Sequence, residues 1–357
     1  MLIFTTTMTP NNITECNASS LRMLDFRGYT SAELDILLYT QTERILVYIL
    51  MPMLCLIGIP SNVAFITMII RVKNLQTATN SYLVNKAFCD IVLLLYSSAA
   101  YLYNLSITSL RSDHPMFSNT DFWPGCFLFW GGVYMLYYVS VLFITVVTIE
   151  RYAAICHPLR HRIVAGKKHT NRLTISSWLL GIALTVVTVF RNSKFLQFCI
   201  VWPAGKEFDS YPNTATYCEP SYPFAIVSEF IFLVPFVLAI IGNTYMNWQM
   251  IYTLSHRVSS DTYSANQKAA EVRVRNQVAR MLIISSTIFF LCQTPYRLHN
   301  IQAIAKYYTD HGIFTDKQFG IVELVGNILV MVNCSTSCLI YFATSSHYRN
   351  GFMEAFF

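Results

Sequence analysis

Seven stretches of this 357-residue chain are long and apolar enough to cross a lipid bilayer. A membrane-spanning helix needs about 20 mostly apolar residues, and its backbone polar groups must be paired internally. Only 12% of the residues are charged, whereas soluble domains carry about 25% charge. The sequence therefore predicts an all-α membrane protein. The predicted spans are Ile45–Ile70, Tyr82–Asn104, Phe127–Ile149, Leu173–Phe190, Tyr222–Ile251, Met281–Tyr296 and Phe319–Phe342.

The basic residues predict the direction in which the chain crosses the membrane. The loop after the first span carries Arg71 and Lys73 without an acidic residue. The loop after the third span carries five basic residues and no acidic one: Arg160, Arg162, Lys167, Lys168 and Arg172. Cytoplasmic loops are rich in Lys and Arg, so we expect a multi-pass plasma-membrane protein with its N-terminus outside. Because the basic residues lie in loops between spans, the net charge of +6 does not indicate nucleic-acid binding.

The spans divide the chain into three parts: an extracellular tail (residues 1–44), a seven-transmembrane domain (residues 45–342) and a cytoplasmic tail (residues 343–357). The first part contains two glycosylation sequons, at Asn12 and Asn17, which have meaning only outside the cell. In the last part, aromatic residues recur at helical spacing. This pattern predicts a short amphipathic helix that lies on the lipid of the inner leaflet.

Four of the ten cysteines fall on the predicted outer side, which is oxidising. These disulfide candidates are Cys16, Cys126, Cys199 and Cys218. Between the last two, the segments Ile200–Trp202 and Thr214–Tyr217 flank a centre rich in Pro, Gly and Asp. Such a pattern predicts a β-hairpin.

A charged triplet follows the third apolar stretch. Glu150-Arg151-Tyr152 comes after a run from Phe127 to Ile149 that contains no Asp, Glu, Lys or Arg. An arginine held by an adjacent glutamate can be released when helices move, so the triplet suggests a conformational switch. The alternative interpretation is a helix-end arginine that extends to the membrane interface.

Further motifs occur in order along the chain. They are Gly58–Asn62, Asn85–Asp90, Trp123–Cys126, Trp178, Pro235, Phe289–Pro295 and Asn333–Tyr341. Cys126 and Arg151 lie 25 positions apart. With the triplet and the seven spans, these motifs resemble the rhodopsin-like (class A) G protein-coupled receptors over nearly the whole chain. The resemblance implies a seven-transmembrane helix bundle with a short amphipathic helix after helix seven. It also implies activation of heterotrimeric G proteins by an extracellular ligand.

The resemblance assigns roles in activation and G-protein coupling to eight residues. They are Glu150, Arg151, Tyr152, Leu159, Pro235, Phe289, Pro295 and Tyr341. Arg151 is expected to pair with Glu150 at rest and to meet the G protein in the active state, while Leu159 inserts into the G protein. The resemblance further implies a disulfide between Cys126 and Cys218. Cys199 remains a rival partner, because sequence does not determine connectivity.

The chain departs from the family pattern at several positions. Gln293 stands where the family has its switch tryptophan, and Cys338 replaces the proline of helix seven. Lys86 replaces a leucine beside Asp90. Arg275 stands where the family often has an acidic residue that holds the arginine of the triplet. We therefore expect the contact between this acidic residue and the arginine of the triplet to be missing. The activation mechanism that depends on the switch tryptophan cannot be transferred to this chain.

Asp90 is a carboxylate within a predicted span, where such groups are costly and usually functional. The resemblance places four oxygen-bearing neighbours around it: Asn62, Ser140, Asn333 and Ser337. In the family, such a set holds a sodium ion, with Asp90 and Ser140 as the expected ligands here. The alternative is a hydrogen-bonded cluster without an ion. We expect no other cofactor.

The spans lack the charged residues that two classes of receptor use to bind their ligands. An amine receptor needs a carboxylate where Val133 stands, and an opsin needs a lysine where Met331 stands. The residues left at the outer ends are Tyr101, Tyr134, Tyr137, Gln293, Tyr296, Arg297, Asn300 and Glu323. Tyrosines, amides and one cation suit a short peptide with backbone carbonyls and an amidated end. Arg297 needs a partner, either Glu323 or the ligand. The stretch Thr79–Asn85 is similar to neuropeptide receptors of the thyrotropin-releasing-hormone and invertebrate RFamide groups.

Other functions fit the sequence less well. Within the receptor class, a lipid or odorant ligand is the alternative to a peptide. A transporter would need charged pairs across several spans or inverted repeats, but the mid-span charges are only Lys86, Asp90 and Glu229. The chain shows no catalytic His/Asp cluster, no Gly-x-Ser-x-Gly motif and no metal-ligand spacing, so we expect no enzymatic activity. The short tail offers few phosphorylation sites for arrestin.

Overall fold

The computed structural model describes residues 22–28, 44–107, 124–189, 194–205, 214–219, 224–258, 266–309 and 311–357. These residues belong to two compact units. Unit 1 comprises Met1–Pro52, Tyr96–Gly131 and Val189–Ala225, and unit 2 comprises the rest of the chain. The sequons at Asn12 and Asn17 lie outside the described residues.

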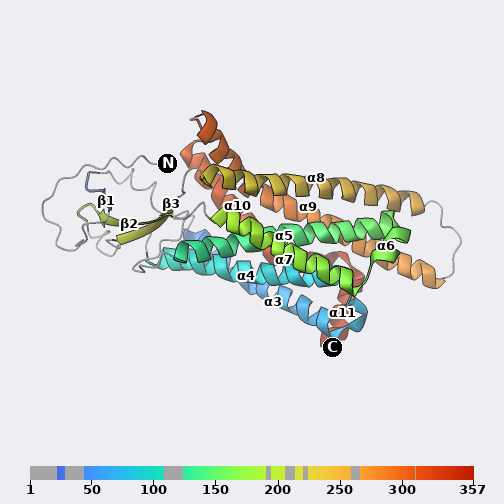
Figure 1. The fold of residues 1–357 in the computed structure, drawn as a ribbon. Helices are drawn as coiled ribbons and strands as arrows, with labels where there is room; N and C mark the ends of the chain where they lie inside the picture. Colours follow the sequence, from blue (N-terminus) through green and yellow to red (C-terminus); the bar gives the residue numbers. More distant parts are fainter. Residues whose placement is uncertain are drawn as a thin grey trace. The chain divides into compact units, whose positions relative to one another are not determined.

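Unit 1 contains a three-stranded sheet in the order β1-β2-β3 (Figure 1). Its strands are β1 (Arg22–Asp25), β2 (Lys194–Val201) and β3 (Thr214–Glu219). The antiparallel pairing of β2 with β3 confirms a hairpin, in a register that places Leu196 opposite Tyr217. Its first strand was predicted too late in the chain, because Lys194–Cys199 pair with β3, whereas Ile200 and Val201 pair with β1. β1 was not predicted. It runs parallel to β2, and the pairing continues through a hydrogen bond from the Phe26 amide to the Val201 carbonyl, at 2.9 Å.

Each predicted span corresponds to a helix that is long and apolar enough to cross a membrane, which confirms the fold class for the described residues. The helices are α3 (Met51–Arg71), α4 (Ala78–Ile107), α5 (Pro124–Cys156), α7 (Lys167–Val189), α8 (Phe224–Val258), α9 (Asn266–Thr309) and α10 (Asp316–Thr344). A π-helical turn, Leu46–Leu50, precedes α3. Several helices run beyond the apolar stretches because polar residues can continue a helix into water. Asn266–Arg280, for example, extends α9 by several turns before its apolar part.

Two shorter helices lie beyond the spans. Helix α11 (Ser346–Phe356) confirms the predicted tail helix. Helix α6 (Pro158–Val164) was not predicted, although Pro158 occupies its first turn, where proline is favoured. A 3-10 turn, Lys73–Leu75, connects α3 to α4.

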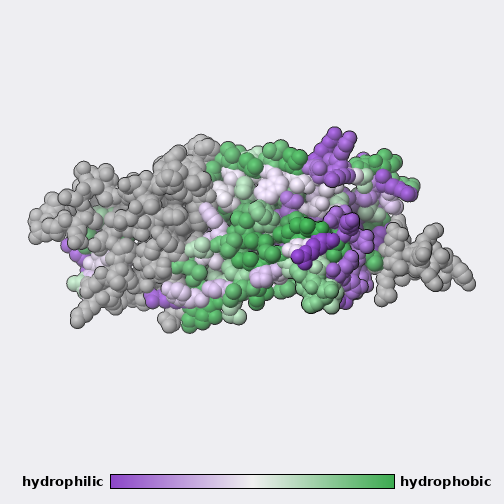
Figure 2. Space-filling view, turned by 90° about the horizontal axis from the view of Figure 1, so that it is seen from below, coloured by the Kyte–Doolittle hydropathy of each residue, from purple (hydrophilic) through white to green (hydrophobic). Residues whose placement is uncertain are grey.

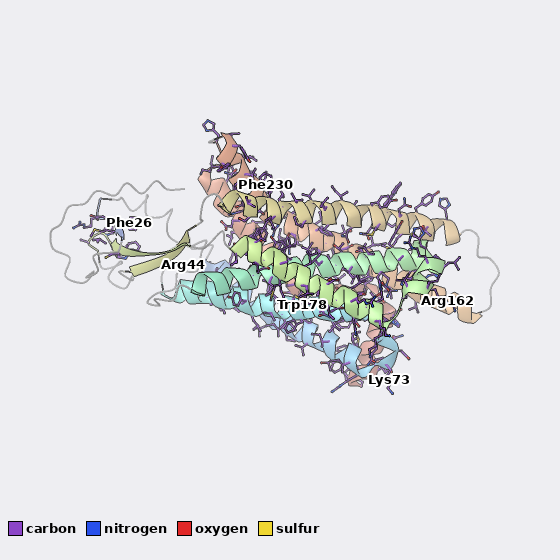
Figure 3. All side chains as sticks on the ribbon, viewed as in Figure 1. Phe26, Arg44, Lys73, Arg162, Trp178 and Phe230 are labelled. Atoms are coloured by element: carbon purple, nitrogen blue, oxygen red, sulfur yellow. The ribbon has the colours of Figure 1, made fainter. Side chains whose placement is uncertain are left out.

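The surface of the described helices is apolar, as a lipid-facing surface requires. Large apolar side chains such as Leu56 and Leu291 are exposed, whereas Lys86 and Asp90 are buried. Figure 2 shows hydrophobic side chains along the middle of the described helices and hydrophilic side chains gathered toward one end. Lys73 and Arg162, which follow the first and third spans, both lie at this end of unit 2 (Figure 3).

Glycines allow two close helix contacts within unit 2. A Cβ atom at Gly58 of α3 would come within 2.7 Å of the Ser335 Cα atom of α10. A Cβ atom at Gly326 of α10 would lie 2.9 Å from the backbone nitrogen of Tyr296 in α9. Only glycine permits such approach without displacing backbone. These contacts hold α10 close to the helices that carry the predicted site residues.

Candidate functional site: three polar clusters in the helical unit

An arginine–aromatic cluster forms around Arg297, two residues beyond the proline of α9. The guanidinium carbon lies 4.0 Å from the centre of the Tyr137 ring and 4.8 Å from that of Tyr296. The rings of Phe232 and Phe236, from α8, lie 5.5 Å and 5.7 Å away. The Arg297 side chain is only 3% exposed, and a buried cation is stabilised by aromatic faces at these distances.

The hydrogen bonds of Arg297 lead to a carboxylate on α8. Its Nη1 donates to Asn300 Oδ1 at 3.4 Å, and Asn300 Nδ2 donates to Glu229 Oε2 at 2.6 Å. The predicted alternative, an ion pair between Arg297 and Glu323, is not formed among the described residues. Asn300 lies three residues beyond Arg297 on α9, within reach of its guanidinium, and connects it to Glu229. Sequence reasoning noted Glu229 as a mid-span charge but did not place it in the ligand site.

Three buried polar atoms of this cluster have no hydrogen-bond partner: Tyr137 Oη, Gln293 Oε1 and Arg297 Nε. Buried polar groups are nearly always paired, so these atoms are suited to a bound molecule. Gln293 and Arg297 lie one helical turn apart on α9. The cluster therefore presents a donor on Arg297, an acceptor on Gln293 and a hydroxyl on Tyr137.

The structure places most of the predicted ligand residues in or beside this cluster. Tyr134 packs edge-on against Phe232, with ring centres 4.6 Å apart, so that α5 and α8 meet there. Glu323 of α10 is buried. The side chain of Tyr101 lies outside the described residues. Phe232 and Phe236 were missed, because the part of α8 from Phe230 to Ile241 is apolar throughout and no local signal separates lipid-facing from inward-facing rings.

The second cluster surrounds Asp90 in the middle of unit 2. Lys86 Nζ lies 2.6 Å from Asp90 Oδ2, and both side chains are 2% exposed. The same ammonium donates to Ser337 Oγ at 3.1 Å. It also lies 5.6 Å from the centre of the Phe289 ring, so the pair connects α4 with α9 and α10.

The other predicted neighbours of Asp90 make separate contacts. Asn62 donates to the Gly58 and Cys334 carbonyls, at 2.8 Å and 3.0 Å, and accepts from the Cys338 thiol at 3.1 Å. Ser140 is buried in α5, and Asn333 has a buried Oδ1 atom without a partner. Cys338, which stands in place of a proline, thus holds the Asn62 side chain that was expected to face the carboxylate.

The third cluster contains the Glu150-Arg151-Tyr152 triplet at the end of α5. The predicted resting pair of Glu150 with Arg151 is wrong for this structure. Glu150 Oε1 instead lies 2.8 Å from Nε2 of His161 in α6, and Arg151 Nε is buried without a hydrogen-bond partner. Adjacent helix residues point in different directions, and α6 brings an imidazole to the glutamate.

Helix α11 closes the space beside Arg151. Tyr348 donates to Asn80 Oδ1 at 2.5 Å and packs near Phe65 and Tyr341. Burial raises the pKa of Tyr348 to about 12. Burial and, secondly, the charge of Arg151 lower the pKa of His347. The tail helix thus lies close to the charge of Arg151.

The structure also describes the other residues to which the resemblance assigns a role in activation. Phe289 and Tyr341 are buried, and Pro235 and Pro295 lie inside α8 and α9. Leu159 is 83% exposed on α6, and its role in coupling stays a prediction. Tyr152 lies beside His157, with its Oη 3.2 Å from the ring Nε2.

The disulfide prediction is addressed only in part. Cys199 of β2 is disulfide-bonded. The side chains of Cys126 and Cys218 lie outside the described residues, so their pairing stays a prediction. Among the described residues, the helix cysteines Cys55, Cys89, Cys156, Cys292, Cys334 and Cys338 form no disulfide.

Comparison with known proteins agrees with this architecture. The family described as "7 transmembrane receptor (rhodopsin family)" matches residues 61–341. The chain is 24% identical over 303 residues to the neuromedin-U receptor 2 of Rattus norvegicus, covering 83% of this chain and 71% of the receptor. It is 23% identical over 283 residues to the thyrotropin-releasing hormone receptor of Gallus gallus, covering 72% and 67%. It is 25% identical over 244 residues to the rhodopsin of Sminthopsis crassicaudata, covering 68% and 64%. With its seven apolar helices and the Glu150-Arg151-Tyr152 triplet near the end of α5, the chain belongs to the rhodopsin family of seven-transmembrane receptors.

Proposed function

We propose that this receptor is activated by an amidated neuropeptide whose terminal carboxamide binds at Arg297 and Gln293. A primary carboxamide offers a carbonyl acceptor and an N–H donor on one carbon. Arg297 Nε is a buried donor without a partner, and Gln293 Oε1 is a buried acceptor without one. This complementarity is the observation that carries the proposal.

The charge of the cluster favours a neutral end group over a free carboxylate. Asn300 links Arg297 to Glu229 through two hydrogen bonds, so the positive charge already has a buried negative counterpart. A carboxylate would add a second negative charge in a place of low dielectric, which is costly. It would also leave the Gln293 acceptor without a donor.

The similarity to neuromedin-U and thyrotropin-releasing hormone receptors supports a peptide ligand over a lipid or an odorant. A retinal ligand is not supported, because Met331 stands where an opsin has its lysine. Binding outside would shift the helices between two arrangements and expose Arg151 to a heterotrimeric G protein, which would also contact the already exposed Leu159. We further propose that the N-terminus is extracellular, since Lys73 and Arg162 lie at one end of the helical unit.

The test is a library of short peptides, each made as the amide and as the free acid, applied to cells that express the receptor. Calcium and cyclic-AMP readouts cover the main G-protein classes, and lipids and odorants occupy control wells. We expect activation by amides and a loss of at least about tenfold in potency for the matching acids, the effect of about 1.4 kcal/mol. Equal potency of the two forms, or responses only to lipids or odorants, would contradict the proposal.

Two variants test whether the terminal carboxamide of the peptide binds at Gln293. Gln293→Leu removes the acceptor and is expected to reduce the preference for amides over acids. Val234→Leu, on the exposed side of α8, changes a lipid-facing side chain and should leave the preference unchanged. Surface expression of both is measured with an N-terminal epitope tag on intact cells, which also tests the proposed orientation. Staining only after permeabilisation would show that the N-terminus lies inside the cell and would contradict the proposed orientation.

A further inference from the structure

The residues around Asp90 do not suit the sodium ion that the family resemblance implies. A monovalent cation needs several oxygen ligands turned toward one point. Here the Asp90 carboxylate lies 2.6 Å from the Lys86 ammonium, and Ser337 Oγ accepts a hydrogen bond from the same nitrogen. The side-chain oxygen of Asn62 accepts from Cys338, at 3.1 Å. Three of the expected groups are therefore already engaged.

The charge balance also opposes a sodium ion. The ion pair of Lys86 and Asp90 is neutral as a whole, and both side chains are 2% exposed. A sodium ion added beside it would leave an excess positive charge in a region of low dielectric, where uncompensated charge is costly. The Phe289 ring centre lies 5.6 Å from Nζ, within cation–π range, and this attraction helps to keep the ammonium beside the carboxylate.

We propose that the Lys86 ammonium is a built-in counter-ion that takes the place of a sodium ion, so that this receptor does not respond to sodium. The lysine lies four residues before the carboxylate on α4, which places the two side chains on one face of the helix. Its contacts with Ser337 on α10 and Phe289 on α9 give the tethered cation a role in holding three helices together. The inference does not depend on the identity of the peptide.

The test measures the melting temperature of the purified receptor in detergent, in sodium chloride and in N-methyl-D-glucamine chloride at a constant ionic strength of about 0.15 M. An ion that binds only the folded state raises the melting temperature, and the rise grows with the concentration of the ion. The wild type should give the same melting temperature in both salts. A sodium-dependent rise in the wild type would overturn the proposal, and this measurement requires no variant.

Two variants identify Lys86 as the cause. Lys86→Met frees the carboxylate and is expected to melt at a higher temperature in sodium chloride than in the organic salt. Lys86→Met combined with Asp90→Asn removes both charges and should again be insensitive to sodium. If Lys86→Met does not fold, Lys86→Gln provides the same comparison with a polar side chain. A folded single variant that ignores sodium would show that Lys86 is not what replaces the ion.

Discussion

The Glu150 carboxylate is held by His161, at 2.8 Å, and not by the arginine that follows it in the chain. Glu150 lies six positions before the end of α5 at Cys156, and His161 lies on α6, which begins at Pro158. The pair therefore fixes the direction of α6. Because α6 carries the exposed Leu159, the pair orients a side chain that is expected to enter the G protein.

Loss of this pair should act on α6 and not on the helical core. His161→Ala and Glu150→Gln are each expected to destabilise the receptor by up to about 1 kcal/mol, the usual value for partly exposed pairs. Their double variant should be no worse than either single one, because the same contact is lost. The melting temperature measures the loss of stability. Receptor-catalysed nucleotide exchange on a G protein measures the effect on α6. Arg162→Ala, an exposed neighbour on α6, is the control. Fully additive losses would refute a direct pair.

Asn300 is expected to be a sensitive position in the outer cluster. Asn300→Leu keeps a similar volume but removes the 2.6 Å donor to the buried Glu229 carboxylate. A lost hydrogen bond to a charged group costs about 1.5–3 kcal/mol, which should lower the melting temperature clearly. Asn300→Gln, which retains an amide, should lose less. Equal melting temperatures for the wild type and the leucine variant would show that the amide does not bridge Arg297 and Glu229.

His347 gives the receptor a sensitivity to acid. Burial and the nearby Arg151 charge lower the pKa of His347 in the folded state. Its contribution is therefore fully present above the ordinary histidine pKa of about 6.5 and is lost as the pH falls through the lower folded value. We expect the melting temperature to fall between neutral pH and about pH 5 by more in the wild type than in His347→Gln. Equal slopes in the two proteins would contradict this assignment.

Local signals predicted the spans, the hairpin and the tail helix, because span length, turn composition and aromatic spacing are each contained in a short segment. Strand β1 escaped prediction, since its partner β2 lies far along the chain and pairs in parallel. The pair of Glu150 and His161 was not predicted, because a break near His157 separates α5 from α6 and changes the direction of the chain between the two residues. The pair of Lys86 and Asp90 could have been predicted from opposite charges four residues apart on a helix.

The close contact of α9 with α10 depends on Gly326. A Cβ atom there would meet the Tyr296 backbone nitrogen at 2.9 Å and its Cα atom at 3.0 Å. Gly326→Ala must therefore separate the helices beside Arg297, at a cost of about 1–3 kcal/mol typical of overpacking. Gly242→Ala is the matched control, because a Cβ atom at Gly242 in α8 meets nothing within 4 Å. Alanine favours helix over glycine by about 0.8–1.0 kcal/mol, so the control should melt at the same temperature or higher. If Gly326→Ala melts with the control, α9 and α10 do not approach so closely in the folded receptor.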